Sequence, residues 1–382
     1  MVIMVEISVV IPVYNCEEFL DDSVGGILNQ TFEDIEVICV DDGSTDNSLK
    51  KLEEFAKNDS RVKVFHQENQ GGGDARNFGL TKTSGKYLYF MDADDIIYPE
   101  ALEACHRLCE KNDLDFVLFK AISYFEVTGQ YEEHDYFTMN KLYECVGDEV
   151  FSFEDVGDLL FEFSVTPWGK LYNRQFVIDS GAQFAHRISF HDNKFFWEML
   201  FNSKRIQFLN ETYYVRRIHP KSLIGSRDRK FFNVFIAYDQ IFEIFRKYDQ
   251  FEIYKAPLYN WKISILYFRF QKIAEEFKQE FLDRTKEEIM KMIDEDGKKK
   301  VEDLLTPQNR VVYDSIFEAD SYKEFSLLMK VDELTRKLNY VKNKNAKLQK
   351  DYDKIKNTND ELVNSKSWKL TKPLRSVRKI KK

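Results

Sequence analysis

The acidic turn Asp92-Ala93-Asp94-Asp95 follows the apolar stretch Tyr87–Met91. Hard divalent cations such as Mg²⁺ and Mn²⁺ bind to carboxylate oxygens and to the phosphate oxygens of a ligand. Asp92 and Asp94 are alternate residues, so their side chains lie on one side of an extended chain. Acidic residues after a strand can instead cap the next helix, a structural role open to Asp94 or Asp95. Taken alone, the turn is therefore consistent with a metal site or a helix cap.

A second polar turn, Val40-Asp41-Asp42-Gly43-Ser44-Thr45-Asp46, also follows an apolar stretch. An aspartate in this turn can accept a hydrogen bond from the N–H of a base or from a ribose hydroxyl. Gly43 allows the chain to turn tightly, and Thr45 or Asp46 could cap the helix that follows. A nucleotide site and a purely structural turn both explain this segment.

Two further segments carry groups that could contact a nucleotide. Pro12-Val13-Tyr14-Asn15 ends an apolar stretch, and the ring of Tyr14 offers a face on which a base could stack. Gly71-Gly72-Gly73-Asp74-Ala75-Arg76-Asn77 is a glycine-rich loop that leads into a helix, and Arg76 could bind a phosphate. Glycine runs are common in ordinary loops, so this segment gains meaning only together with the others.

The elements expected around these segments place all four at one edge of a sheet. We expect strands at 7–13, 35–40, 62–65, 87–91 and 116–121, and helices at 17–28, 48–57, 74–83 and 99–111. Short apolar strands that alternate with helices predict a largely parallel sheet with both faces covered. Ligands of such α/β sheets bind beyond the carboxyl ends of the strands, where the four segments lie.

The rest of the chain changes character in steps. We expect residues 1–225 to form one domain, in which the aromatic-rich part from 122 adds antiparallel strands and short helices. Residues 226–325 have apolar side chains three and four residues apart, which predicts packed helices. Residues 326–366 follow as a coiled coil, and 367–382 as a basic tail.

The coiled coil is predicted from a heptad repeat. One core position holds Val331, Leu338, Asn345, Tyr352 and Asn359, and the other holds Leu334, Val341, Leu348, Ile355 and Leu362. Asparagines at one core position favour two-stranded pairing in a fixed register. We therefore expect a homodimer or a higher homo-oligomer. The alternative is one long helix that packs on its own domain.

Bulk composition excludes several classes of protein. The chain of 382 residues contains 33 Phe and 20 Tyr, enough for a packed core, so it is not a disordered protein. Its net charge of −9 argues against general nucleic-acid binding. There is no apolar run of about 18 residues, no basic or apolar leader and no metal-type cysteine pair. We expect a cytoplasmic protein with reduced thiols.

Taken together, the four segments resemble glycosyltransferase family 2, whose members have the GT-A fold, a Rossmann-like α/β domain that binds nucleotide sugars. The matching segments, in the family's order, are Ile11-Pro12-Val13-Tyr14-Asn15, Val40-Asp41-Asp42-Gly43-Ser44-Thr45-Asp46, Ala75-Arg76-Asn77-Phe78-Gly79 and Asp92-Ala93-Asp94-Asp95. The resemblance is strong over the first 120 residues and extends to about residue 225. It points towards the bacterial and archaeal members that build surface polysaccharides.

The resemblance implies how a donor would be bound. The implied donor-binding residues are Pro12, Tyr14 and Glu17 around the nucleotide, Asp41 at the base, and Arg76 and Asp92 near the diphosphate and sugar. Asp94 would hold a divalent metal, Mn²⁺ or Mg²⁺. The donor would be a nucleotide-diphosphate sugar, and UDP is the commonest carrier in such enzymes.

The resemblance also implies a catalytic base. Family members carry an acidic pair before a helical Phe, and Phe190-His191-Asp192-Asn193-Lys194-Phe195 occupies that place here. Asp192 is the candidate base, while His191 stands where Glu is commoner. Further on, Tyr214-Val215-Arg216-Arg217-Ile218-His219-Pro220-Lys221-Ser222 resembles a loop that closes on the diphosphate. Arg217 could offset leaving-group charge there, and His219 could bind the metal, although a lone histidine is more often structural.

The tail from Ser365 to Arg375 resembles a segment that follows coiled coils in surface-polysaccharide glycosyltransferases. Trp368, Leu370 and Leu374 stand among lysines and could contact an anionic membrane at its inner face. A solvated basic tail is the alternative.

The whole sequence predicts an inverting glycosyltransferase that moves a sugar to a hydroxyl of a glycan or lipid-linked acceptor. The alternative is a non-catalytic nucleotide-sugar-binding scaffold assembled through the coiled coil.

Overall fold

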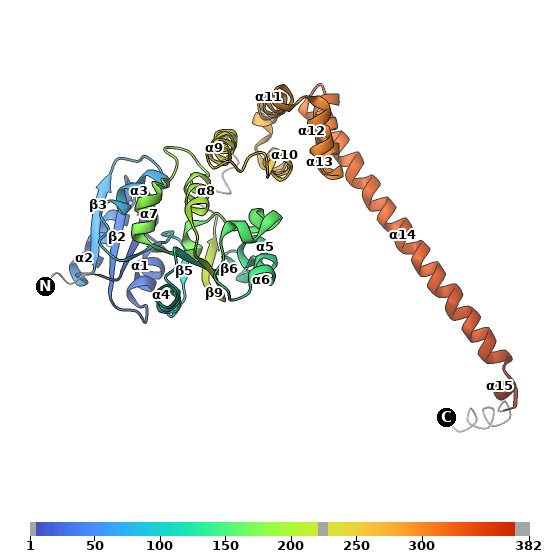
Figure 1. The fold of residues 1–382 in the computed structure, drawn as a ribbon, viewed down its shortest axis with the longest axis horizontal. Coiled ribbons are helices and arrows are strands. Elements are labelled where there is room, and N and C mark those ends of the chain that lie inside the picture. The colour runs from blue at the N-terminus through green and yellow to red at the C-terminus, as the bar shows by residue number, and fades with distance from the viewer. Residues whose placement is uncertain (1–4, 221–227, 371–382) are drawn as a thin grey trace. The chain divides into compact units, whose positions relative to one another are not determined.

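The computed structural model describes residues 5–220 and 228–370 and contains two compact units, Met1–Thr306 and Pro307–Lys382 (Figure 1). The first unit contains a mixed sheet with helices on both faces, and further helices follow the sheet in sequence. The second unit consists of helices. None of the helices in the described ranges combines the length and the apolar character needed to cross a bilayer.

Half of the nine-stranded sheet is parallel. Its strands, in spatial order, are β3 (Val62–Gln67), β2 (Ile35–Asp42), β1 (Ile7–Val13) and β4 (Tyr87–Phe90). Helices cover both faces of this half, which is why its central strands are continuous apolar runs. Because the four strands are parallel, their carboxyl ends meet at one edge of the sheet.

The other half is mixed. It contains strands from beyond residue 121, as expected, but also the strand expected at 116–121, which lies here and not among the parallel strands. Beyond β4 the order is β8 (Lys170–Asn173), β6 (Phe116–Phe125), β9 (Ile206–Ile218) and β5 (Ile96–Ile97), and β7 (Gln130–Glu132) pairs with β6. Only β6 and β9 are parallel neighbours in this half, and their register shifts between Phe119 and Ala121. Such a bulge increases the local twist of the sheet.

Helices α1 (Leu20–Leu28) and α4 (Ala101–Asn112) cover one face of the sheet, and α3 (Gly72–Leu80), α7 (Arg174–Ser180) and α8 (Asp192–Asn202) lie on the other (Figure 1). The other helices of this region are α2 (Ser48–Asn58), α5 (Asp135–Thr138) and α6 (Asn140–Val146). On the α1 face, alternate residues of β1 such as Ile7, Val9 and Ile11 are completely buried.

Helix α3 packs unusually close to the sheet. A Cβ atom added to Gly79 would lie 2.4 Å from Cγ1 of Val10 in β1, so only glycine fits there. This contact gives the glycine of the Ala75–Gly79 motif a packing role, and it fixes the distance between α3 and the strand ends.

Three helices begin at other residues than the sequence suggested. The helices expected from residues 17, 74 and 99 begin at Leu20, Gly72 and Ala101. Residues 17–19 form a turn because the Glu17 carboxylate accepts hydrogen bonds from Asn47 at the start of α2. Conversely, α3 starts earlier than expected because Gly71, with φ +97°, redirects the chain immediately before it.

The helices that follow the sheet are α9 (Asn233–Lys247), α10 (Lys255–Lys272), α11 (Lys278–Asp296) and α12 (Lys298–Leu304). The aromatic stripe predicted to be core is buried throughout: Phe231, Phe235, Tyr238, Phe242 and Phe245. These helices belong to the first compact unit.

The second unit contains α13 (Pro307–Glu318), α14 (Tyr322–Asn364) and α15 (Lys366–Leu370). Helix α14 is continuous over 43 residues and includes the whole heptad repeat. Its apolar heptad residues are at least half exposed in the single chain: Val331, the first of them, is 54% exposed and Leu362, the last, is 55% exposed. The repeat therefore lies on a helix as expected, and its pairing with a second chain stays a prediction.

Candidate active site

The polar segments at the strand ends come together as the sequence suggested. Val13 of β1 lies beside Asp41 of β2, and Asp41 lies beside His66 of β3. Three neighbouring strands thus end in one row. His66 was missing from the sequence interpretation, although its position at the end of the third strand is the signal that would have found it.

Asp41 is fully buried yet only partly hydrogen-bonded. Its Oδ2 atom lies 2.7 Å from Nδ1 of His66 and accepts a hydrogen bond from the Ser44 N–H. Its Oδ1 atom is buried and has no hydrogen-bond donor among the described residues. Leaving such an acceptor unsatisfied costs about 1–3 kcal/mol. An N–H group of a bound ligand would satisfy it.

Tyr14 and Glu17 lie in the loop after β1 and have different surroundings. Tyr14 is 48% exposed, so one face of its ring is available to a ligand. The next residue, Asn15, binds the second polar turn: its Oδ1 accepts a hydrogen bond from the Thr45 N–H at 2.7 Å. The Glu17 carboxylate accepts hydrogen bonds from the side chain and backbone of Asn47, which ties it to α2. Pro12, in β1, is half-buried beside Val40.

Arg76 joins the acidic turn to the candidate base. It is 5% exposed, donates a hydrogen bond to Oδ1 of Asp92, and places Nη1 4.0 Å from Oδ1 of Asp192. Burial lowers the pKa of Arg76, but the charges of Asp92 and Asp192 outweigh it and raise the pKa above its ordinary value. The structure thus brings together Arg76, Asp92 and Asp192 from three separate segments.

The segment that carries Asp192 is held by α3. Asn77 exchanges two hydrogen bonds with the backbone of Phe184, at 2.9 and 3.0 Å. Asp74 lies 2.5 Å from His186 Nδ1 and accepts a hydrogen bond from the Arg187 N–H. Asp74 and Asn77 are positioning residues that the sequence interpretation missed. Asn77 lies in the matching motif, but its partner is more than one hundred residues away.

Asp192 remains ionised although it is half-buried. Burial raises its pKa, but His191, Arg76 and Lys170 together lower the pKa below the ordinary aspartate value. His191 places Nδ1 2.7 Å from Oδ1 of Asp192. Lys170 is itself buried, donates hydrogen bonds to the carbonyls of Ser164 and Thr166, and has its pKa lowered by burial to about 7. An ionised, partly accessible carboxylate is what a general base requires.

The acidic turn forms a compact group of carboxylates. Asp92, Asp94 and Asp95 can each place an oxygen within 4.8 Å of the others. Asp95 is buried and accepts hydrogen bonds from the Tyr214 hydroxyl and the Arg217 N–H, both at 2.7 Å. Asp95 therefore anchors β9 to the turn. Helix α4 has no side-chain cap, so neither Asp94 nor Asp95 serves the capping role considered above.

Asp94 and His219 are the residues best placed to hold a divalent cation. Oδ2 of Asp94 lies 3.0 Å from Nε2 of His219, whose ring packs 4.5 Å from the ring of Phe19. Burial and the charge of Asp94 raise the pKa of both Asp92 and Asp95, an effect that Arg76 opposes at Asp92. A cation would relieve this repulsion, and carboxylate and imidazole ligands suit Mn²⁺. The donor set therefore fits the implied metal.

Arg217 has acidic partners in this structure. Its guanidinium binds Asp22, lies 3.7 Å from Glu126, and sits 5.0 Å above the ring of Phe19. Phe19 also contacts His219, so Arg217 lies on the same side of the site as the candidate metal ligands. Its predicted role at the diphosphate would require that it exchange one of these carboxylates for the ligand.

Cys16 shows that the two acidic turns lie close together. Burial and then the charges of Asp94, Asp46 and Asp92 raise the pKa of its thiol to about 12. The thiol therefore stays protonated and unreactive at neutral pH. Charges from both turns act on this one side chain, as convergence on a single site requires.

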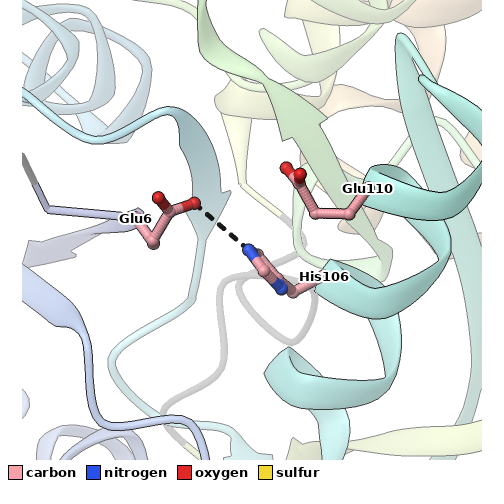
Figure 2. A group of neighbouring side chains, drawn as sticks. All are labelled: Glu6, His106 and Glu110. Carbon is pink, nitrogen blue, oxygen red and sulfur yellow. Dashed lines mark hydrogen bonds and ion pairs between the residues drawn. The ribbon is translucent and has the colours of Figure 1, made fainter.

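A second group of potential ligands, Glu6, His106 and Glu110, lies at the opposite edge of the sheet (Figure 2). His106 places Nε2 3.2 Å from Oε2 of Glu6. Glu110 pairs with Lys86 and accepts a hydrogen bond from the Tyr87 hydroxyl at 2.6 Å. These partners already neutralise Glu110, so the group is a structural network between α4 and the starts of β1 and β4.

The chain resembles known proteins both in sequence and in fold. Residues 8–166 match the model of glycosyl transferase family 2. Glycosyltransferase GlyG of Streptococcus pneumoniae serotype 4 is 32% identical over 280 residues, which is 72% of this chain and 88% of GlyG. The fold is similar to that of S. aureus TarS 1-349 in complex with UDP-GlcNAc, with a TM-score of 0.65 at 19% identity over 86% of this chain and 92% of TarS 1-349.

The match to GlyG covers most of both chains, and the family model spans β1 to the segment before β8, which contains the four matching segments but not Arg217 and His219. The mixed sheet is also similar to the GT-A sheet of TarS 1-349. The chain therefore belongs to glycosyl transferase family 2 and is a glycosyltransferase.

Proposed function

We propose that the chain is an inverting, metal-dependent glycosyltransferase that uses a UDP-sugar to extend a surface polysaccharide or its lipid-linked precursor. The observation that carries this proposal is the ion network in which Arg76 contacts both Asp92 and Asp192. It places an ionised candidate base beside the residues predicted to surround the donor sugar. A donor and an acceptor hydroxyl can then meet at one point.

The donor is expected to lie across the carboxyl ends of the parallel strands. The nucleobase of the donor would stack on Tyr14 and donate a hydrogen bond from an N–H to the free Oδ1 of Asp41. Uracil has one imide N–H suited to this contact. The diphosphate would lie beside Asp94 and His219. A divalent cation held there would offset the negative charge that the diphosphate gains as the glycosidic bond breaks.

The transfer itself requires one proton acceptor. Asp192 removes the proton from the acceptor hydroxyl as the hydroxyl oxygen attacks the anomeric carbon. The bond between the anomeric carbon and the diphosphate oxygen breaks, and the diphosphate leaves with the electron pair. Attack from the face opposite the leaving group inverts the anomeric configuration. Arg76 fixes the carboxylate of Asp192 relative to Asp92 throughout this step.

Two structural neighbours support the choice of a nucleotide-sugar donor. S. aureus TarS 1-349 has been solved with UDP-GlcNAc and with UDP, at TM-scores of 0.65 and 0.57. These complexes support UDP as the carrier, together with the free acceptor atom on Asp41.

Hydrolysis of a panel of nucleotide sugars, with Mn²⁺ and then with EDTA, tests the proposal. We expect UDP-sugars to be cleaved in the presence of Mn²⁺ and cleavage to stop when the metal is removed. Asp192→Asn should lower transfer by about 10²–10⁴-fold and leave the thermal shift by UDP and Mn²⁺ unchanged. Asp179→Asn, on the exposed surface of α7, is the control and should behave as the wild type.

Two results would contradict these assignments. Transfer by Asp192→Asn within tenfold of the wild type would remove Asp192 as the base. Binding of UDP and Mn²⁺ without hydrolysis or transfer of any donor would support the non-catalytic scaffold instead.

We also propose that the chain self-associates through α14 and that its basic tail contacts an anionic membrane. The exposed heptad stripe supports the first proposal, and a parallel dimer would place Asn345 opposite Asn345 of the second copy. The exposed Trp368 and Leu370, followed by a segment whose charged residues are all basic, support the second.

A further inference from the structure

Two arginines near the candidate base have no acidic partner. Arg216 lies in β9 and Arg269 in α10, and neither forms an ion pair or a hydrogen bond through its guanidinium with any described residue. The residues outside the description, 1–4, 221–227 and 371–382, contain no aspartate or glutamate. Both charges therefore lack an acidic side-chain partner anywhere in the chain.

Aromatic rings hold these two cations in place. The Cζ atom of Arg269 lies 4.5 Å from the ring centre of Phe190, and Phe231 and Phe268 lie at 5.2 and 5.4 Å. The Cζ atom of Arg216 lies 5.4 Å from the ring of Phe137. Cation–π contacts contribute about 0.5–2 kcal/mol each and leave the positive charge available to an anion.

Both arginines lie near Asp192. Phe190, which contacts Arg269, is separated from Asp192 by a single residue. Phe137, which contacts Arg216, packs against Tyr136 with ring centres 5.1 Å apart. Burial raises the pKa of Tyr136, and the charges of Asp192 and Arg216 both act on its hydroxyl. Tyr136 is thus electrostatically coupled to the base and to Arg216.

The alternation of β9 separates Arg216 from its neighbour Arg217. Arg217 contacts Asp22 and Phe19, and its N–H binds Asp95 of the acidic turn. Adjacent residues of a strand point to opposite faces, so Arg216 lies on the face of β9 opposite to Arg217, the face that also carries Tyr214, and its guanidinium lies against Phe137. The two uncompensated charges are therefore separate from Arg217, whose side chain and N–H are already bound to Asp22 and Asp95.

We propose that Arg216 and Arg269 form an anion-binding subsite for the acceptor and that the acceptor carries a phosphate group near the hydroxyl that receives the sugar. This inference rests on the proposed transferase function and names the substrate class of the same site. Phosphate oxygens can accept hydrogen bonds from two guanidinium groups at once. A lipid-linked sugar phosphate and a polyol phosphate polymer share this chemistry.

Equilibrium binding of small probes to the full chain tests the subsite without any turnover. Hexyl phosphate and the neutral hexanol are titrated calorimetrically, with and without saturating UDP and Mn²⁺, so that binding at the donor site is separated from binding at the acceptor site. We expect hexyl phosphate to bind to the UDP-loaded protein and hexanol not to bind. Arg269→Gln and Arg216→Gln should each weaken hexyl phosphate at least tenfold, while Arg269→Lys should retain most of the affinity.

Arg246→Gln is the matched control. Arg246 also stacks on an aromatic ring, 4.0 Å from Phe251, but it is paired with Glu295. Its replacement should leave hexyl phosphate binding unchanged, and unfolding curves of all variants identify any loss of the fold. If the wild type does not bind hexyl phosphate, or if Arg269→Gln and Arg246→Gln bind it equally, the subsite does not exist.

The source of the phosphate is decided by two further probes. Tighter binding of farnesyl phosphate than of glycerol phosphate would indicate a lipid-linked acceptor, and the reverse order would indicate a polyol phosphate. Binding of hexanoate as tight as that of hexyl phosphate would overturn the preference for phosphate. Donor hydrolysis is measured separately, so failure of the subsite and failure of the transferase function give different results.

Discussion

The carboxylate of Asp192 illustrates how a half-buried base can keep its charge. Burial alone would favour the neutral acid, which cannot accept a proton. His191, Arg76 and Lys170 lower the pKa of this residue below its ordinary value in spite of burial. The family resemblance leads one to expect Glu before this aspartate, whereas His191, a side chain that can become a cation, stands there.

This difference predicts a change in the pH profile. In His191→Gln one of the groups that stabilise the anionic form of Asp192 is lost, so the pKa of Asp192 should rise. The acid limb of the profile of kcat should therefore move to higher pH, because the base becomes protonated earlier as the pH falls. Donor hydrolysis measured from pH 3.5 to 8 checks this, and an acid limb that stays in place or moves down would contradict it.

Single residues were predicted well where a motif defines them and poorly where a distant contact does. Asp41, Arg76, Asp92, Asp94 and Asp192 were named from the sequence, and the structure places them around one edge of the sheet. Their roles with a ligand stay predictions. His66 was missed although its position at the end of the third strand pointed to it. Asp74 and Asn77 were missed because each acts through a partner on another segment, and no local pattern reveals that partner. The contacts of Glu17 with Asn47 and of Arg217 with Asp22 were unforeseen for the same reason.

Helix α3 is the element that connects the donor side to the base. Its residues contact β1, the acidic turn and the segment that carries Asp192. At its start, a Cβ atom added to Gly73 would lie 2.7 Å from the carbonyl oxygen of Ala185 and 3.0 Å from Cβ of His191. The first turn of α3 and the base segment are therefore packed without space for one methyl group.

This close contact predicts that Gly73→Ala displaces the base. The added methyl group should push His191 and Asp192 away from Arg76, and a displacement of about 1 Å can lower turnover by about 10²-fold. Gly25→Ala is the control, because a Cβ atom there meets nothing within 4 Å. The prediction is checked by measuring the transfer rate and the UDP affinity of both variants. Equal transfer rates for Gly73→Ala and Gly25→Ala would contradict it.

Elements were predicted more reliably than their ends. Each strand and helix expected in the first 121 residues is present, because apolar periodicity follows directly from burial on a covered sheet. The helix starts at Gly72 and Ala101 differ from expectation because local backbone turns and contacts with other segments determine them. The pairing of β6 with β9 could not be foreseen, since it joins strands about ninety residues apart.

At the scale of the whole molecule, the unpaired heptad stripe of α14 predicts a dimer. Leu348 is 57% exposed in the single chain and lies near the middle of the stripe. Leu348→Asp should weaken self-association by about 10²-fold or more, since a core leucine contributes about 2–5 kcal/mol. Lys350→Asp, outside the stripe, should leave it unchanged. Sedimentation equilibrium measures both, and a wild-type monomer at micromolar concentration would refute the coiled-coil dimer.

The basic tail predicts binding to anionic vesicles. Trp368 and Leu370 can insert at the interface, while the basic residues, with no acidic residue beyond Glu361, are attracted to anionic lipids. The full chain should sediment with vesicles that contain phosphatidylserine, and a chain that ends at Leu362 should remain in solution. Equal sedimentation of the two chains would exclude the tail as a membrane contact.

The tight fit at Gly73 has a consequence for any attempt to change what this enzyme glycosylates. Acceptor choice is expected to depend on the segment around residues 184–192, yet that segment rests directly on the first turn of α3. Transplanting the segment alone from a relative would bring side chains of another shape against a surface without spare room. A chimaera that exchanges segment 184–192 together with the first turn of α3 would preserve the close packing between them. A change of acceptor preference therefore requires that both segments change together.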